Sequence, residues 1–170
     1  MTGRGVRSGT GAEAELFWED LVPGRQFDLG ITDVDRDEML AFARRFDPQW
    51  YHLDERLAAS SEYGGLIASG FFTVSLFMRA YVDGLLSRAA AAASPGLEEL
   101  RWLAPVYAGD RLAVTLAVIA QDPSRTRPGC GTVTLRGSMT RLPPAEARGG
   151  EPREALRTQF RGWFFRREAG

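Results

Sequence analysis

Residues 64–86 read GGLIASGFFTVSLFMRAYVDGLL, and this stretch decides the fold of the 170-residue chain. The glycines and the serine ahead of the apolar run are typical of a turn that leads into a helix. The stretch therefore predicts a long helix that begins at Ala68 or Ser69 and ends near Leu86. Its apolar side chains fall on nearly every face, as expected of a helix that a sheet wraps around. The most apolar part, from Leu66 to Met78, is too short to span a membrane.

The segments on either side of this helix complete an α+β pattern. Alternating apolar and polar residues predict a strand over Phe27–Val34. Asp35 or Asp37 can cap the next helix, which ends at about Phe46. Ala89–Pro95 extends the long helix weakly. Four more strands are predicted over Leu97–Val106, Arg111–Ala120, Cys130–Leu142 and Leu156–Arg166. One strand, several helices and then four strands is the order of an α+β protein.

The composition favours a single ordinary domain, expected over residues 16–170. Hydrophobic residues make up 44% of the chain, which is enough for a packed core. The net charge of -1 gives no electrostatic reason to expect nucleic acid or an anionic membrane surface as a partner. The single cysteine, Cys130, excludes an internal disulfide and suits the reducing cytoplasm, which is the expected location.

The N-terminal residues 1–15 are predicted to be a flexible tail. They are rich in Gly, Ser and Thr and contain no apolar segment that resembles a signal peptide. Such a segment buries too little apolar surface to order itself. We therefore expect removal of Met1–Ala14 to leave the melting temperature and the activity almost unchanged.

The chemistry of the chain is concentrated in residues 46–54, FDPQWYHLD. Pro48 disfavours helical geometry in the residue before it, so Asp47 is expected at a helix-to-loop junction. His52, the only histidine, follows five residues later, and Asp54 can cap a short helix over Glu55–Ser60. A carboxylate and an imidazole at the two ends of one tight loop can both exchange protons with a single small volume. Taken singly, an aspartate before a proline is usually a turn former, and a lone histidine is usually structural.

The combination of these segments resembles the MaoC-like family. Its pattern is an aspartate, a loop with Pro and Asn or Gln, a histidine five positions on, and an aspartate two beyond, which here are Asp47, Pro48-Gln49, His52 and Asp54. The resemblance continues through residues 64–70, 100–102, 105–106 and 109–110 and covers roughly residues 17–166. It implies the hot-dog fold, an antiparallel sheet wrapped around a long central helix.

The resemblance also implies an activity. MaoC-like proteins add water to, or remove it from, acyl thioesters, here expected to convert enoyl-CoA to (R)-3-hydroxyacyl-CoA. Asp47 and His52 are implied to contact one water, and either can be the base. The backbone N–H of Gly70 is the implied donor to the thioester carbonyl, a role that suits an unpaired amide at a helix start.

Coenzyme A is expected only as part of the substrate. No metal or redox cofactor is implied, since one histidine and one cysteine cannot supply a usual zinc site. The resemblance further implies a homodimer whose second subunit extends the sheet, because a single sheet leaves exposed edges.

Two positions depart from the pattern of many relatives, which carry a proline near position 50 and a histidine at position 69. Trp50 can cover the site or pack on the surface, and Ser69 is predicted to be a helix N-cap. Arg125 and Arg127 are weak candidates for contacts with coenzyme A phosphates. The alternatives to a hydratase are a thioesterase of the same fold and a non-catalytic subunit that binds acyl thioesters.

Overall fold

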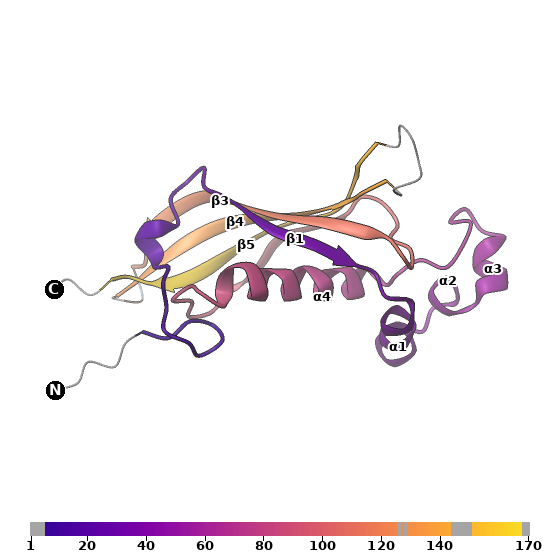
Figure 1. Cartoon of the computed structure of the whole chain (residues 1–170), viewed down its shortest axis with the longest axis horizontal. Helices are drawn as coiled ribbons and strands as arrows, with labels where there is room; N and C mark the ends of the chain where they lie inside the picture. The colour runs from indigo at the N-terminus through magenta and orange to yellow at the C-terminus, as the bar shows by residue number, and fades with distance from the viewer. Residues whose placement is uncertain (1–5, 126, 128, 144–150, 168–170) are drawn as a thin grey trace.

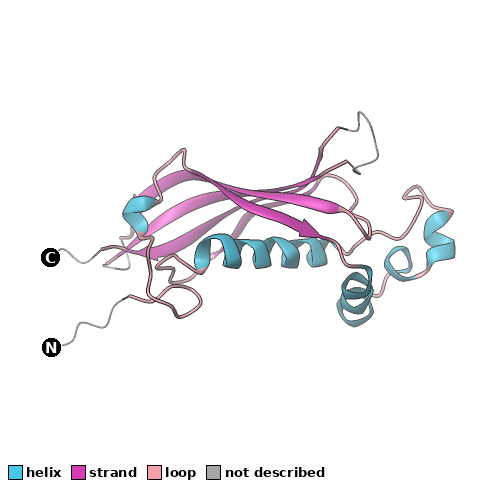
Figure 2. Ribbon diagram, in the orientation of Figure 1, coloured by secondary structure: helices cyan, strands magenta, loops and turns pink. Residues whose placement is uncertain are grey.

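The computed structural model describes residues 6–125, 127, 129–143 and 151–167. One antiparallel sheet with the strand order β1-β3-β4-β5-β2 lies against a central helix (Figures 1 and 2). The strands are β1 (Gln26–Asp33), β2 (Gly96–Trp102), β3 (Arg111–Pro123), β4 (Cys130–Arg141) and β5 (Arg153–Phe165). The helices are η1 (Trp18–Asp20), α1 (Arg36–Phe46), α2 (Trp50–Leu53), α3 (Glu55–Ala59), α4 (Gly70–Tyr81) and the π-helical turn η2 (Val82–Leu86).

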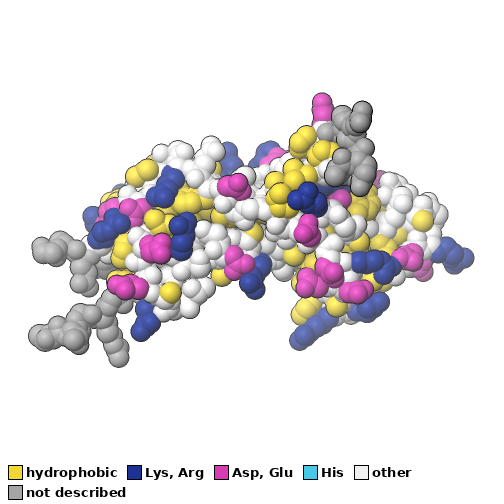
Figure 3. All heavy atoms as spheres, viewed as in Figure 1, with side chains coloured by type: hydrophobic (Ala, Val, Ile, Leu, Met, Phe, Trp, Pro, Cys, Tyr) yellow, Lys and Arg dark blue, Asp and Glu magenta, His cyan; other side chains and the backbone are white. Residues whose placement is uncertain are grey.

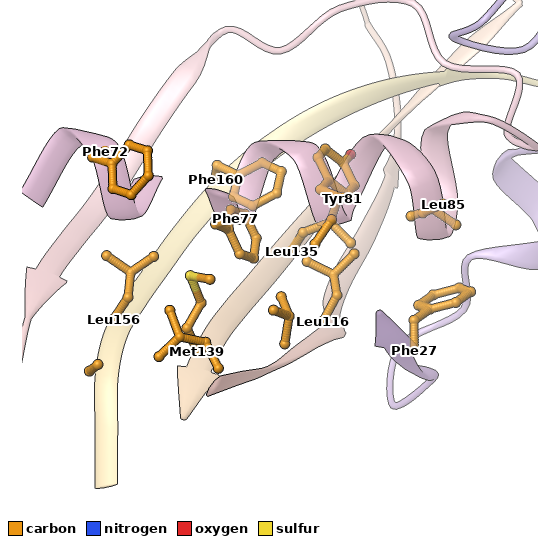
Figure 4. Packing of buried hydrophobic residues seen from close by; sticks show 14 of the residues in the cluster. Phe27, Phe72, Phe77, Tyr81, Leu85, Leu116, Leu135, Met139, Leu156 and Phe160 are labelled. Carbon is orange, nitrogen blue, oxygen red and sulfur yellow. The ribbon is translucent and has the colours of Figure 1, made fainter. Parts of the chain in front are cut away.

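The core lies between α4 and the concave face of the sheet. Figure 4 shows the aromatic side chains of Phe77 and Tyr81 with Phe160 from β5 and Leu135 from β4 around them. Phe77 reaches the sheet directly over Gly137, where an added Cβ would lie 2.2 Å from the Phe77 ring. The absence of a side chain on β4 at this point therefore lets the helix approach the sheet closely.

The expected α+β class, the five strands and the capped helix before Asp47 are all present. Asp35 caps α1 by accepting hydrogen bonds from the N–H groups of Asp37 and Glu38. α1 ends at Phe46, as Pro48 predicts, and Asp54 caps α3 through the N–H of Leu57.

Three local expectations are wrong. The loop expected around His52 contains the helical turn α2, which is too short for a periodic pattern to indicate it. Residues 89–95 do not extend the helix, because Ala91 pairs with Phe164 at the sheet margin. The sheet covers only one face of α4, so that Phe71 and Met78 are 61% and 48% exposed.

Within the expected flexible tail, residues 6–15 are attached to the rest of the domain; residues 1–5 lie outside the described part of the chain. The N–H of Gly9 donates to the carbonyl oxygen of Leu86 at 2.8 Å. The N–H of Glu15 donates to the carbonyl oxygen of Arg88, also at 2.8 Å. Ser8 is buried. This segment, which we call the N-terminal loop, lies at the C-terminal end of the central helix (Figure 1). Backbone hydrogen bonds, rather than apolar side chains, attach it.

The surface and the edges of the sheet give further information about partners. On the face drawn in Figure 3, arginine and acidic side chains are interspersed rather than gathered by sign. Strand β2 is an outer strand, and its Leu97 and Trp102 are about half exposed. No helix in the described residues is long and apolar enough to cross a membrane.

Candidate active site

Asp47 is held at the end of α1 by the backbone. It is the C-cap residue, and its N–H donates to the Ala43 carbonyl at 2.9 Å. The helix cannot continue into Pro48, so the Asp47 side chain leaves the helix and projects toward the start of α4. There Ser69 donates its hydroxyl hydrogen to Asp47 Oδ2 at 2.7 Å. The carboxylate remains partly accessible, with 22% of the side chain exposed.

His52 is presented by the short helix α2 and is only 4% exposed. Its Nδ1 lies 2.7 Å from the carbonyl oxygen of Ile67. A carbonyl can only accept a hydrogen bond, so Nδ1 carries the hydrogen, and Nε2 is the nitrogen free to exchange a proton. Nε2 lies 3.2 Å from Asp47 Oδ2. Asp47 and His52, which are expected to contact one water, thus lie in direct contact with each other.

Two side chains hold Asp47 as a carboxylate. Partial burial acts to raise the pKa of Asp47, but hydrogen bonds from Gln49 and Ser69 and the nearby His52 outweigh it, and the pKa lies below its ordinary value. Gln49 Nε2 donates to Asp47 Oδ1 at 2.7 Å, while Tyr51 donates its phenolic hydrogen to Gln49 Oε1. Each carboxylate oxygen therefore has its own neutral donor, which favours the charged form.

The pair can exchange a proton in two arrangements. When Nε2 carries a proton, the imidazolium of His52 forms an ion pair with the Asp47 carboxylate. Without that proton, both Nε2 and Oδ2 are acceptors, and one water on the cavity side of the pair can donate a hydrogen to each. A site that alternates between these two arrangements can take a proton from water and return it.

Gly70 lies on the wall of the same cavity as Asp47 and His52, which has a volume of about 520 Å³. It is the first residue of α4, so its N–H has no acceptor within the helix, and the helix dipole adds positive potential there. Trp102 explains why a glycine is needed, because an added Cβ would lie 2.5 Å from its indole ring. The cavity is completed by the aromatic rings of Tyr51, Tyr63 and Phe71 and by the segment from Leu103 to Val106.

The structure corrects the expected role of Ser69. Ser69 occupies the N-cap position of α4, but its side chain makes no capping hydrogen bond and binds Asp47 instead. The sequence gives no signal for this contact, because 22 residues separate the two partners. Gln49 and the Ile67 carbonyl were also missed as partners of the pair. Their roles depend on the tertiary arrangement of α1, α2 and the start of α4.

The other residues singled out in the sequence lie away from the pair. Trp50 is 46% exposed, does not line the cavity, and packs edge-on against Tyr51. Of its two interpretations, surface packing is the one that the structure bears out. The Arg127 guanidinium stacks over the ring of Trp163, with its Cζ 4.5 Å from the ring centre. Arg127 does not line the cavity that contains Asp47 and His52. In the described part of the chain, no group of three or more His, Cys, Asp or Glu is placed to hold a metal ion.

Known proteins are similar to this chain in sequence and in fold. A family model described as "MaoC like domain" matches residues 21–138. The chain is 33% identical over 126 residues to 3-hydroxyacyl-thioester dehydratase Z of Mycobacterium tuberculosis, covering 71% of this chain and 81% of that one. It is 28% identical over 117 residues to the uncharacterized protein YdeM of Bacillus subtilis, and this match covers 69% of this chain and 83% of YdeM.

A solved structure agrees over nearly the whole length. The crystal structure of the MaoC-like dehydratase from Rhodospirillum rubrum superposes with a TM-score of 0.74 at 36% identity, and covers 91% of this chain and 100% of that one. The family model covers the chain from β1 into β4, including α4 and the segment with Asp47 and His52, so sequence and architecture point to the same family. The chain has the hot-dog fold and belongs to the MaoC-like family.

Proposed function

We propose that this protein is a hydratase or dehydratase of acyl thioesters, which interconverts enoyl-CoA and (R)-3-hydroxyacyl-CoA. The observation that carries the proposal is the 3.2 Å contact between His52 Nε2 and Asp47 Oδ2 in a cavity shared with Gly70. The name of the M. tuberculosis relative, a 3-hydroxyacyl-thioester dehydratase, supports the same reaction class.

The proposed reaction uses one water for both new bonds. The water donates one hydrogen to Asp47 Oδ2 and the other to His52 Nε2. Nε2 takes its proton as the hydroxide oxygen adds to carbon 3 of the enoyl group, and the electron pair of the double bond moves to the thioester oxygen. The Gly70 N–H stabilises that enolate oxygen. His52 then returns the proton to carbon 2, so that the elements of one water are added. Dehydration is the reverse sequence.

A panel of enoyl-CoAs tests this function directly. Loss of enoyl absorbance, followed together with a thiol reagent, separates the candidate activities. Hydration removes the absorbance and releases no thiol, whereas a thioesterase releases free coenzyme A. Binding with neither signal would identify a non-catalytic subunit. Chiral analysis of the product is expected to show the (R) isomer, and a predominant (S) isomer would contradict the proposed placement of water.

We also propose that the protein acts as a cytoplasmic homodimer that needs no added metal or redox cofactor. The outer strand β2 leaves Leu97 and Trp102 exposed, and α4 leaves Phe71 and Met78 exposed beside them. A second copy paired along β2 would cover both sets of side chains and the open sheet edge. Such pairing would also add a wall to the cavity that contains Trp102 and Gly70.

A further inference from the structure

A second cavity lies beside α4, on the side of β2 and β5, and has a volume of about 340 Å³. Its walls include Val74, Phe77 and Met78 from α4, Leu97 and Leu100 from β2, and Phe160 from β5. None of its lining residues, all of which the structure describes, carries a charge. A cavity with this lining suits an alkyl chain rather than a polar ligand.

This apolar cavity continues the line of the catalytic cavity along the same two elements. α4 contributes Gly70 and Phe71 to the catalytic cavity and then, one turn further, Val74 to the apolar one. β2 contributes Trp102 to the first and Leu100, two residues away, to the second. An acyl chain whose thioester carbonyl is at the Gly70 N–H and which follows α4 therefore leads into the apolar cavity.

The N-terminal loop reaches the far end of this cavity through one residue, Gly9. Gly9 lines the cavity next to Leu86, and the small side chains of residues 91–93 form the adjoining wall. An added Cβ on Gly9 would lie 3.0 Å from the Leu86 carbonyl oxygen and 3.1 Å from its Cβ, so the close approach depends on glycine. The hydrogen bonds from Gly9 to Leu86, and from Glu15 and Leu16 to Arg88, hold the loop in this place.

We propose that the N-terminal loop, residues 6–15, is the end wall of an acyl-chain pocket and limits the length of the acyl chain that the enzyme accepts. The proposal rests on the proposed function, since it takes the chain to be that of the thioester held at Gly70. A methylene group is taken to occupy about 30 Å³, the volume of one water molecule in the liquid. A cavity of about 340 Å³ therefore holds a chain of roughly ten such groups. The substrate class is therefore an acyl thioester of medium chain length.

Two variants change the pocket in opposite directions. Ala92→Leu adds bulk to the wall and shortens the pocket, whereas removal of residues 2–14 opens its end. Ala59→Leu is the matched control, because it makes the same change on the exposed end of α3. The measurement is kcat/KM for enoyl-CoAs from about four to sixteen carbons, with melting temperatures for each protein.

For the wild type we expect kcat/KM to rise with chain length up to about ten carbons and then to fall. Ala92→Leu should move the maximum to shorter chains and lower kcat/KM by about fourfold for each methylene that no longer fits, with the four-carbon substrate spared. The truncated protein should extend the range to longer chains, and Ala59→Leu should match the wild type. An unchanged length profile in a folded Ala92→Leu would show that no acyl chain enters the cavity, and an unchanged profile in the truncated protein would show that the N-terminal loop is not its end wall. Either result would overturn the proposal.

Binding of saturated acyl-CoAs, measured by calorimetry, gives a readout that does not depend on turnover. We expect affinity to increase from butyryl-CoA to decanoyl-CoA in the wild type and to increase less in Ala92→Leu. If the wild type binds the two equally, there is no acyl pocket, and the proposal fails even where enoyl-CoA is hydrated. If the chain-length dependence is present but no enoyl-CoA is hydrated, the pocket stands and the proposed function is wrong.

Discussion

At the scale of single residues, the proposed chemistry depends on Asp47 being a carboxylate. Ser69 is fully buried and donates to Asp47 Oδ2, the same oxygen that faces His52. A hydrogen bond to a charged acceptor contributes more than one between neutral groups. Ser69 is therefore a positioning residue: it favours the carboxylate form and aims Oδ2 at His52.

We predict that Ser69→Ala lowers turnover by roughly tenfold and the free energy of unfolding at neutral pH by about 1–2 kcal/mol. Because Ser69 helps to lower the pKa of Asp47, its contribution to stability is present above the ordinary aspartate pKa and is lost as pH falls through the folded-state pKa. Urea unfolding at several pH values should therefore show a destabilisation that shrinks toward acid pH.

Ser60→Ala is the control for this variant, because the Ser60 hydroxyl donates to the backbone carbonyl of Leu57 and not to a carboxylate. Its effect on stability should be small and should not vary with pH. A Ser69→Ala protein with wild-type turnover, or with a destabilisation that is constant with pH, would contradict the role assigned to Ser69.

At the scale of helices and strands, close packing between α4 and the sheet depends on Gly137. We predict that Gly137→Ala lowers the free energy of unfolding by about 1–3 kcal/mol, since its Cβ would overlap the Phe77 ring. Gly65→Ala should be close to neutral, because a Cβ there meets no atom within 4 Å and the residue has no positive φ. Denaturant unfolding of both variants checks this, and equal stability of the two would show that the helix can move away from β4 without cost.

Most of these elements could be predicted from the sequence, and the reasons are local. Asp35 before α1, Pro48 after it and Asp54 before α3 are start and stop signals that act within one turn. The position of Asp47 directly after α1 was predicted for the same reason, whereas the helical turn that carries His52 was not.

The features that escaped prediction depend on distant partners or on backbone groups. The contact of Ser69 with Asp47 needs the fold to bring α1 to the start of α4. The N-terminal loop docks through main-chain N–H and carbonyl groups, which no side-chain pattern reports. The sequence predicts that α4 is buried on all sides, because apolar residues on an exposed face cannot be distinguished from core residues by their type alone.

At the scale of the whole molecule, that exposed face and the open edge of β2 predict a homodimer. Light scattering at micromolar concentrations should give a mass near twice the 18.7 kDa of one chain. The exposed apolar side chains on α4 and on β2 are adjacent, so a single dimer interface would cover both. A monomeric mass across the whole concentration range would contradict this prediction and would leave the wall near Trp102 open to solvent.

The central claim is that Asp47 and His52 handle the protons of one water as a unit. It is tested most directly by turnover of the best enoyl-CoA for wild type, Asp47→Asn, His52→Gln and the double variant, with circular dichroism to confirm the fold. Each single change should lower turnover by roughly a hundredfold to ten-thousandfold. The double variant should be scarcely worse than the poorer single one, because either loss already disables the pair. Near-wild-type turnover in either single variant, or losses that multiply fully in the double variant, would contradict the shared-water mechanism.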